Sequence, residues 1–217
     1  MKVFVSPSNQ SDNRYAYGNT TEREQCEKIA TALIHHLTRC GITPVYDFSK
    51  DMYGRVAMSD AENCDIHLPI HTNAFNGSVS GTRIYCYDRS GVGYKVSSAI
   101  FTELAPITPG TSESVQTANF YEIRVPRAKT AYVEVEFHDN PNSAKWIIEH
   151  TDDIAVAICK GLCRYAGIAY VPEKAPEQAD NDGLWKVQVG AYKNKANAEK
   201  MAAKLKEAGF PTYIVKS

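Results

Sequence analysis

The sequence predicts an α/β fold, with a mostly parallel, twisted sheet flanked by helices and a small separate βαβ module at the C-terminus. Short apolar segments of strand length alternate with longer segments of helical periodicity up to about residue 170. This alternation is typical of parallel sheets with crossover helices. Polar residues follow several of the expected strands. Because ligands gather beyond the carboxyl ends of strands in such sheets, these residues are candidates for a site.

The N-terminal half of the main domain alternates regularly between strands and helices. A threonine just before acidic residues predicts a capped helix start at Thr21, and Gly41 predicts the end of that helix. The expected elements in chain order are a strand at 1–5, a polar loop at 6–13, a helix from 21 to 41, a strand at 42–46, a helix at 52–61 and a strand at 65–71.

The C-terminal half of this domain continues the alternation and ends near residue 170. Proline, glycine, serine and threonine at 108–118 suit a mobile loop over a site. The expected elements are a strand at 82–87, a helix at 94–104, the polar loop at 108–118, a strand at 121–125, a strand at 130–138 and helical segments, in one piece or two, from 141 to 165.

A second module follows a linker. Residues 171–183 contain proline, acids and amides without an apolar period, which predicts a linker between a domain at 1–170 and a module at 184–217. The module is expected to be a βαβ unit with a strand at 184–191, a helix at 195–208 and a strand at 211–215. One such unit is too small to bury both faces of its own sheet.

Composition and charge argue against several classes of function. The formal net charge of −1 gives no indication of a nucleic-acid partner. No apolar run of about eighteen residues occurs in the sequence, so no membrane span is expected. The first strand starts at once, without room for a signal peptide. We therefore expect synthesis in the cytoplasm and action on an outside target only after lysis or non-standard export.

Six cysteines are scattered through segments that resemble core, and we expect them to be reduced thiols. Cys159 and Cys163 share one face of a helix and could form half of a metal site. No second cysteine pair completes it, so both are interpreted as small buried side chains.

Glu22, His71 and Glu134 are the candidate site residues. They stand at a helix start, at the end of an apolar strand and on a late strand, where a parallel sheet would bring them together. A carboxylate and a neutral imidazole are ligands that Zn²⁺ prefers, and a second carboxylate can take a proton from water. His67 shares the expected strand face of His71 and is interpreted as a hydrogen-bonded structural histidine.

At these residues the chain resembles the zinc-dependent N-acetylmuramoyl-L-alanine amidases of the type 3 class, over about residues 1–168. The first helix of that family begins with a ligand glutamate seven residues before an Ile-Ala pair, as Glu22 precedes residues 29–30 here. Its third strand ends in Ile-His, a small residue and Asn, as residues 70–73 do. Its late strand reads Val-Glu, any residue, Gly-Phe, two residues and Asn, which residues 133–140 match apart from Glu136 in place of glycine.

The resemblance implies a peptidoglycan hydrolase, of the autolysin or phage endolysin type, that cleaves the amide between N-acetylmuramic acid and L-alanine. It implies that His71 and Glu22 hold Zn²⁺. Glu134 would be the general base that deprotonates the attacking water and passes the proton to the leaving amine. The alternative is a catalytically inactive protein of the same fold that only binds cell wall.

The chain departs from the family at the first metal ligand. Where the family has a histidine, this chain reads Pro7-Ser8-Asn9-Gln10, and an amide is a poor zinc ligand. His138 follows Glu134 by four residues on the same expected strand face, so it is the first candidate for the third ligand. Gln10 and Glu136 are the alternatives, together with a site that has no third protein ligand.

The C-terminal module resembles one repeat of the SPOR type, over the strand at 185–192, the helix that follows and the return strand at 208–215. The resemblance implies binding to glycan strands of peptidoglycan, with Gln188 and Tyr192 as contact residues. A complete domain of that family holds two βαβ units, and this chain has one. We therefore expect two chains to pair as a homodimer through residues 184–217.

Overall fold

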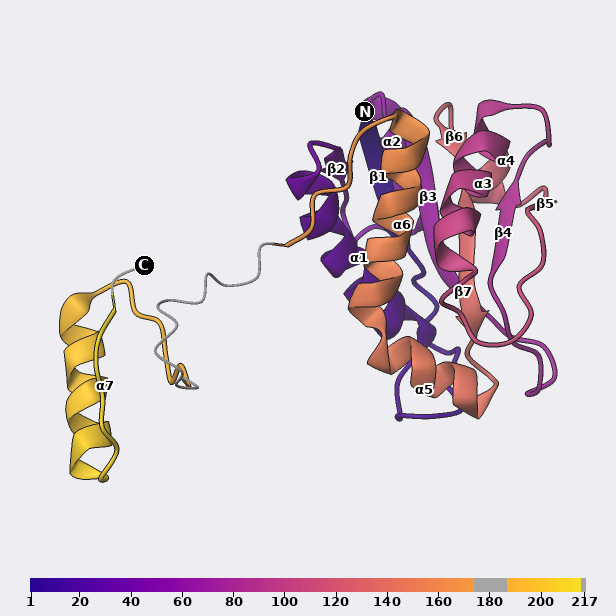
Figure 1. Ribbon diagram of the computed structural model, residues 1–217. Helices are drawn as coiled ribbons and strands as arrows, with labels where there is room; N and C mark the ends of the chain where they lie inside the picture. Colours follow the sequence, from indigo (N-terminus) through magenta and orange to yellow (C-terminus); the bar gives the residue numbers. More distant parts are fainter. Residues whose placement is uncertain (174–186, 216–217) are drawn as a thin grey trace. The chain divides into compact units, whose positions relative to one another are not determined.

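The protein is described by a computed structural model that covers residues 1–173 and 187–215 (Figure 1). The chain divides into two compact units, Met1–Glu173 and Lys174–Ser217. Each unit is considered separately below. Within the described residues, no helix has the length and apolar character needed to cross a membrane.

A twisted sheet forms the centre of the first unit. Its strands are β1 Lys2–Pro7, β2 Thr43–Val45, β3 Ile66–Asn73, β4 Arg83–Cys86, β5 Gln116–Thr117, β6 Lys129–Thr130 and β7 Tyr132–Phe137. They lie in the order β2-β1-β3-β7-β4-β5, and β6 pairs with β3. Every pair is parallel except β4 with β7, so the prediction of a mostly parallel sheet is confirmed.

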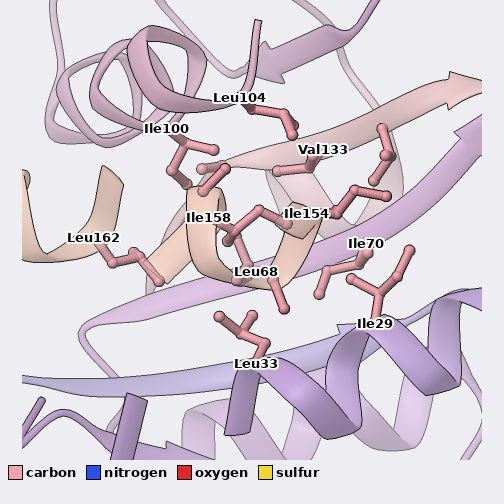
Figure 2. Close-up of a cluster of buried hydrophobic side chains, with 14 of the residues drawn as sticks. Ile29, Leu33, Leu68, Ile70, Ile100, Leu104, Val133, Ile154, Ile158 and Leu162 are labelled. Atoms are coloured by element: carbon pink, nitrogen blue, oxygen red, sulfur yellow. The ribbon is translucent and has the colours of Figure 1, made fainter. Parts of the chain in front are cut away.

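Helices cover both faces of this sheet. They are α1 Glu22–Arg39, α2 Met52–Ala61, α3 Val92–Leu104, α4 Tyr121–Arg124, α5 Pro141–Glu149 and α6 Thr151–Ala166. The main core lies between the sheet and the layer formed by α1, α3 and α6 (Figure 1). In Figure 2, side chains of β3 and β7 meet side chains from these helices, among them Ile29, Ile100 and Ile158.

Strand alternation divides the apolar residues of β1 between two clusters. Val3 and Val5 belong to the main core, whereas Phe4 belongs to a smaller cluster against which Met58 of α2 packs. Both faces of β1 are therefore buried, as expected for a parallel sheet with helices on each side. This burial leaves the strand ends as the places where polar side chains can gather.

The start of α1 follows from its capping chemistry. The hydroxyl of Thr21 accepts a hydrogen bond from the backbone N–H of Glu24, and the Glu24 carboxylate accepts one from the backbone N–H of Thr21. This reciprocal pair fixes the first turn and makes Glu22 the first helical residue. The predicted helix start is confirmed, and it places the Glu22 carboxylate next to the end of β3.

Two predicted strands of the main domain differ from the structure. The strand expected at 121–125 is wrong, because Tyr121–Arg124 forms the single helical turn α4. A segment this short fits one turn of helix as well as a strand, since its one buried apolar residue, Ile123, sets no period. The strand expected at 130–138 is divided into β6 and β7, which pair with different parts of β3.

The second unit contains the predicted helix, α7 Lys195–Glu207. The strands predicted on either side of it are not formed within residues 187–215, and residues 184–186 lie outside the described part of the chain. A strand needs a partner to pair its backbone groups. Strand formation by the two flanking segments therefore depends on a pairing partner.

Close packing of α3 against α6 gives a prediction about stability. A Cβ atom added at Gly161 would lie 2.4 Å from the Cα of Ile100. We expect Gly161→Ala to lower the free energy of unfolding of the first unit by about 1–3 kcal/mol, measured by urea denaturation. Alanine has the higher helix propensity. A rise in stability would therefore show that propensity prevails and would contradict the packing argument.

Candidate metal centre

The candidate residues Glu22, His71 and Glu134 come together at one edge of the sheet. In the parallel pair β3–β7, His71 lies directly opposite Glu134. The first turn of α1 brings Oε1 of Glu22 to 2.9 Å from Nδ1 of His71. Three segments far apart in the sequence thus meet where the strands end, as the α/β pattern predicts.

Glu134 is half-buried, and one of its carboxylate oxygens is shielded from solvent. Its Oε2 atom has no hydrogen-bond partner among the described residues. Burial is the main cause that raises the pKa of Glu134, to about 7. The positive charge of His71 lowers this pKa, and the negative charge of Glu22 raises it. A carboxyl group with a pKa near neutrality can both accept and return a proton.

Glu122 is a fourth member of this group that the sequence did not reveal. It lies on α4, and its Oε1 accepts hydrogen bonds from Oγ of Ser6 at 2.6 Å and Nε2 of His67 at 3.1 Å. Its Oε2 lies 3.7 Å from Nε2 of His71. Burial opposes ionisation of Glu122, but hydrogen bonds and charge from His67 and His71 lower its pKa to about 2.

His71 therefore has acidic side chains on several sides. Burial alone would lower its pKa, but hydrogen bonds to Glu122 and Glu22 and the negative charge of Glu134 raise it to about 9. The ring also stacks on Tyr132, with 4.7 Å between centroids. The carboxylates outnumber the single imidazole at the meeting point, and this arrangement favours a bound cation.

The three candidates for a further ligand are placed very differently. The amide nitrogen of Gln10 lies 3.5 Å from Nδ1 of His71, and Asn13 donates to both Gln10 and Glu22. His138 instead places Nδ1 at 3.0 Å from the hydroxyl and the carbonyl of Thr72. Within residues 1–173 and 187–215, no third His, Cys, Asp or Glu has a ligand atom grouped with those of Glu22 and His71 within 4.8 Å.

A β-bulge explains why His138 and Glu136 do not join Glu134. His71 pairs with Glu134 but Asn73 pairs with Phe137, so β7 has one more residue than β3 in this interval. The alternation used to align His138 with Glu134 does not extend past this point. Glu136 accepts hydrogen bonds from the backbone N–H of Gly81 at 2.7 and 2.6 Å.

A cleft leads to His71. It has a volume of about 330 Å³ and is formed by the loop after β1, the start of α2 and the segment of α4. His71, Glu122 and Tyr132 lie at its lining together with Ser8 and Gln10. The expected loop after β1 thus forms one wall of the site.

The cysteines are free thiols, and three of them lie together. Cys40 joins the predicted pair Cys159 and Cys163, with ligand atoms within 4.8 Å of one another. Burial raises the pKa of Cys163 to about 11 and raises that of Cys159 further. The thiols of Cys159 and Cys163 are therefore neutral at ordinary pH, and both side chains belong to the main core.

Comparison with known families decides the family of the chain. The model of the N-acetylmuramoyl-L-alanine amidase family matches residues 3–164. The chain belongs to this family. A SPOR domain matches residues 181–217, which confirms the predicted architecture. The chain is therefore a peptidoglycan hydrolase of the amidase class, and this family is generally zinc-dependent.

Relatives and solved structures agree with this assignment. The sporulation-specific N-acetylmuramoyl-L-alanine amidase of Bacillus subtilis is 27% identical over 99% of this chain and 84% of its own length. The amidase CwlM of Bacillus licheniformis is 24% identical over 99% of this chain and 85% of its own length. The catalytic domain of CwlV from Paenibacillus polymyxa has the same fold, with a TM-score of 0.70 and 16% identity over 77% of this chain and 98% of that one.

The surroundings of His71 predict how it titrates. With metal removed by a chelator, we expect its imidazole to keep its proton until the pH rises through about 9, because Glu22 and Glu122 stabilise the charged ring. A pH titration followed by NMR of histidine-labelled protein measures this pKa. Glu22→Gln should lower it. A midpoint at or below the ordinary histidine value of about 6.5 would contradict the described geometry.

Proposed function

We propose that this amidase cleaves the amide between N-acetylmuramic acid and L-alanine with the help of Zn²⁺ held by Glu22 and His71. The observation that supports this proposal most is the 2.9 Å approach of Glu22 to Nδ1 of His71, with Glu134 directly opposite on the next strand. Gln10 is proposed as the third ligand, since it is the candidate whose side chain reaches the same nitrogen.

The donor set suits Zn²⁺. An imidazole nitrogen and a carboxylate oxygen are preferred ligands, and an amide of Gln10 turned to present its oxygen supplies a weaker one. Asn13 donates to Oε2 of Glu22 at 2.6 Å and so orients this carboxylate, whereas its contact with Oε1 of Gln10 at 2.8 Å is given up when the amide turns. Hydrogen bonds from neighbouring side chains orient metal ligands. Asn13 therefore supports the proposed ligand Glu22, and Gln10 takes the place of the missing family histidine.

The division of labour among the carboxylates follows from their surroundings. Bound Zn²⁺ supplies a Lewis acid that polarises the scissile carbonyl and makes water more acidic. Glu134, whose Oε2 is unpartnered, takes the proton from the attacking water and then delivers it to the nitrogen of the departing L-alanine. Phe120 and Tyr121 line the cleft and exclude water beside the reacting amide.

Substitution of Glu134 tests the assigned base. We expect Glu134→Gln to slow the release of free amino groups from purified cell wall by about 10²–10⁴-fold, because no other group replaces the proton acceptor. Zinc content, measured by elemental analysis, should stay unchanged since Glu134 is not a ligand. Glu149→Gln on the surface of α5 is the control, and it should release amino groups at the wild-type rate. Undiminished hydrolysis by Glu134→Gln would refute its role, and a wild-type protein that binds wall without hydrolysis would support an inactive wall-binding protein.

The C-terminal unit is proposed to hold the enzyme on its substrate. The SPOR match implies peptidoglycan binding, and we assign the contact surface to Gln188 and Tyr192. The Tyr192 side chain is 42% exposed and can stack on a sugar ring. Gln188 reaches the carbonyl of Gly190 at 3.5 Å, so its amide lies at the same turn. Glycan strand and stem peptide would then be held by different units of one chain.

Pairing of two chains through residues 184–217 also remains our proposal. Apolar side chains of the segments that flank α7 are solvent-exposed, in particular Val187, Val189, Phe210, Ile214 and Val215. A second copy could cover these side chains and pair with the two segments that flank α7.

Sedimentation equilibrium of the full chain tests this pairing. We expect a dimer, and we expect the double substitution Val189→Ser and Phe210→Ser to weaken it at least tenfold, because both side chains lose apolar contact. Phe75→Ser is the matched control, since Phe75 is 75% exposed in the first unit. A wild-type monomer at all concentrations would refute the proposal.

A further inference from the structure

The two ring nitrogens of His71 face two different carboxylates. Nδ1 lies 2.9 Å from Glu22, and Nε2 lies 3.7 Å from Oε2 of Glu122. A neutral imidazole that binds a metal through one nitrogen carries its proton on the other nitrogen. The hydrogen-bond partner of the protonated nitrogen therefore determines which nitrogen is available to the metal. In this site the second partner is Glu122.

Glu122 is itself held in place from several directions. Its Oε1 is occupied by the Ser6 hydroxyl and the His67 ring, at 2.6 and 3.1 Å. Its backbone carbonyl accepts a hydrogen bond from Oγ1 of Thr130 at 2.9 Å. Only Oε2 is left to face His71. The residue is 4% exposed, so its carboxylate cannot readily turn towards solvent.

The neighbours of Glu122 have their own anchors. The ring of His67 is fully buried and stacks on Phe4, with 5.3 Å between centroids and 9° between planes. Ser6 lies at the end of β1, which pairs with β3 in register. A chain of contacts from the sheet through His67 and Ser6 thus fixes the carboxylate that faces Nε2 of His71.

The same geometry argues against Glu122 as a ligand of a metal shared with Glu22. Ligand atoms of Glu22, His71 and Glu122 do not form a group within 4.8 Å of one another, among the residues that the structure describes. The two carboxylates approach different nitrogens of one ring. A metal held by Glu22 and Nδ1 therefore leaves Glu122 on the far nitrogen.

We propose that Glu122 is a positioning residue: its carboxylate faces the N–H group at Nε2 of His71 as an ion-pair partner and thereby holds the ring with Nδ1 directed at the metal. This inference rests on the proposed zinc-dependent function of the site. Tyr132 stacked on the ring restricts its tilt, and Glu122 restricts its rotation and its tautomer. The carboxylate thus acts through His71 and does not touch the reacting atoms.

Metal affinity of the full-length protein gives the first test. We expect Glu122→Gln to weaken zinc binding by about 10–100-fold, measured by competition with a chromophoric chelator. Glu136→Gln is the matched control. Glu136 is also a fully buried glutamate at this sheet, but its hydrogen bonds go to backbone N–H groups away from His71. We expect this control to bind zinc as the wild type does.

Nitrogen NMR gives a readout that a merely structural role would not change. In ¹⁵N-histidine-labelled protein loaded with ¹¹³Cd²⁺, we expect coupling from the metal to Nδ1 of His71 and a proton on Nε2. In Glu122→Gln, the coupling to Nδ1 should weaken or divide between the two nitrogens of His71. The signals of the other histidines should keep their wild-type positions, which shows that the variant is folded.

The outcomes separate the two proposals. Coupling to Nε2 in the wild type, or unchanged zinc affinity in Glu122→Gln with tight wild-type binding, would overturn the role of Glu122 and leave the zinc-dependent function standing. A wild-type protein that takes up neither Zn²⁺ nor Cd²⁺ would overturn both. Equal loss of affinity in Glu122→Gln and Glu136→Gln would show a general loss of structure and would also refute the specific role.

Discussion

The position of β3 between β1 and β7 is the constraint on which the site depends. Both neighbours run parallel to β3, so the carboxyl ends of the three strands meet at one edge of the sheet. His71 enters the site from the middle strand, Ser6 from one neighbour and Glu134 from the other. The main core of α1, α3 and α6 buries the apolar face of these strands and so holds their ends in fixed relation. Without that pairing, the polar residues would have no common meeting point.

Electrostatic balance at this meeting point explains why the residues occupy such different states. One imidazole lies near several carboxylates that differ in their burial and in their hydrogen bonds. Glu122 has two firm donors and stays ionised, whereas Glu134 has an unpaired oxygen and holds its proton near neutral pH. Environment alone thus separates an anchoring carboxylate from one able to exchange protons.

The sequence was sufficient where local chemistry and period agreed. The capped start of α1 and the apolar run of β3 identified Glu22 and His71, and the motif of β7 identified Glu134, all of which the structure brings together. It was insufficient where tertiary contacts decide. Glu122 was not predicted as a site residue, because a single helical turn is too short to show a hydrophobic periodicity. The bulge in β7 shifts the strand after Glu134. His138, the first candidate for the third ligand, therefore contacts Thr72 and does not join Glu22 and His71.

The capping box at Thr21 has a consequence for the charge of the site. Because Glu22 is the first residue of α1, its carboxylate lies at the positive end of the helix macrodipole, which favours its ionised form. The helix thus keeps the carboxylate that we propose as a metal ligand anionic before any cation arrives. Under the proposed zinc-dependent function, a site charged in advance would attract a divalent ion from solution by long-range steering, so the rate of metal capture would depend in part on the first turn of this helix.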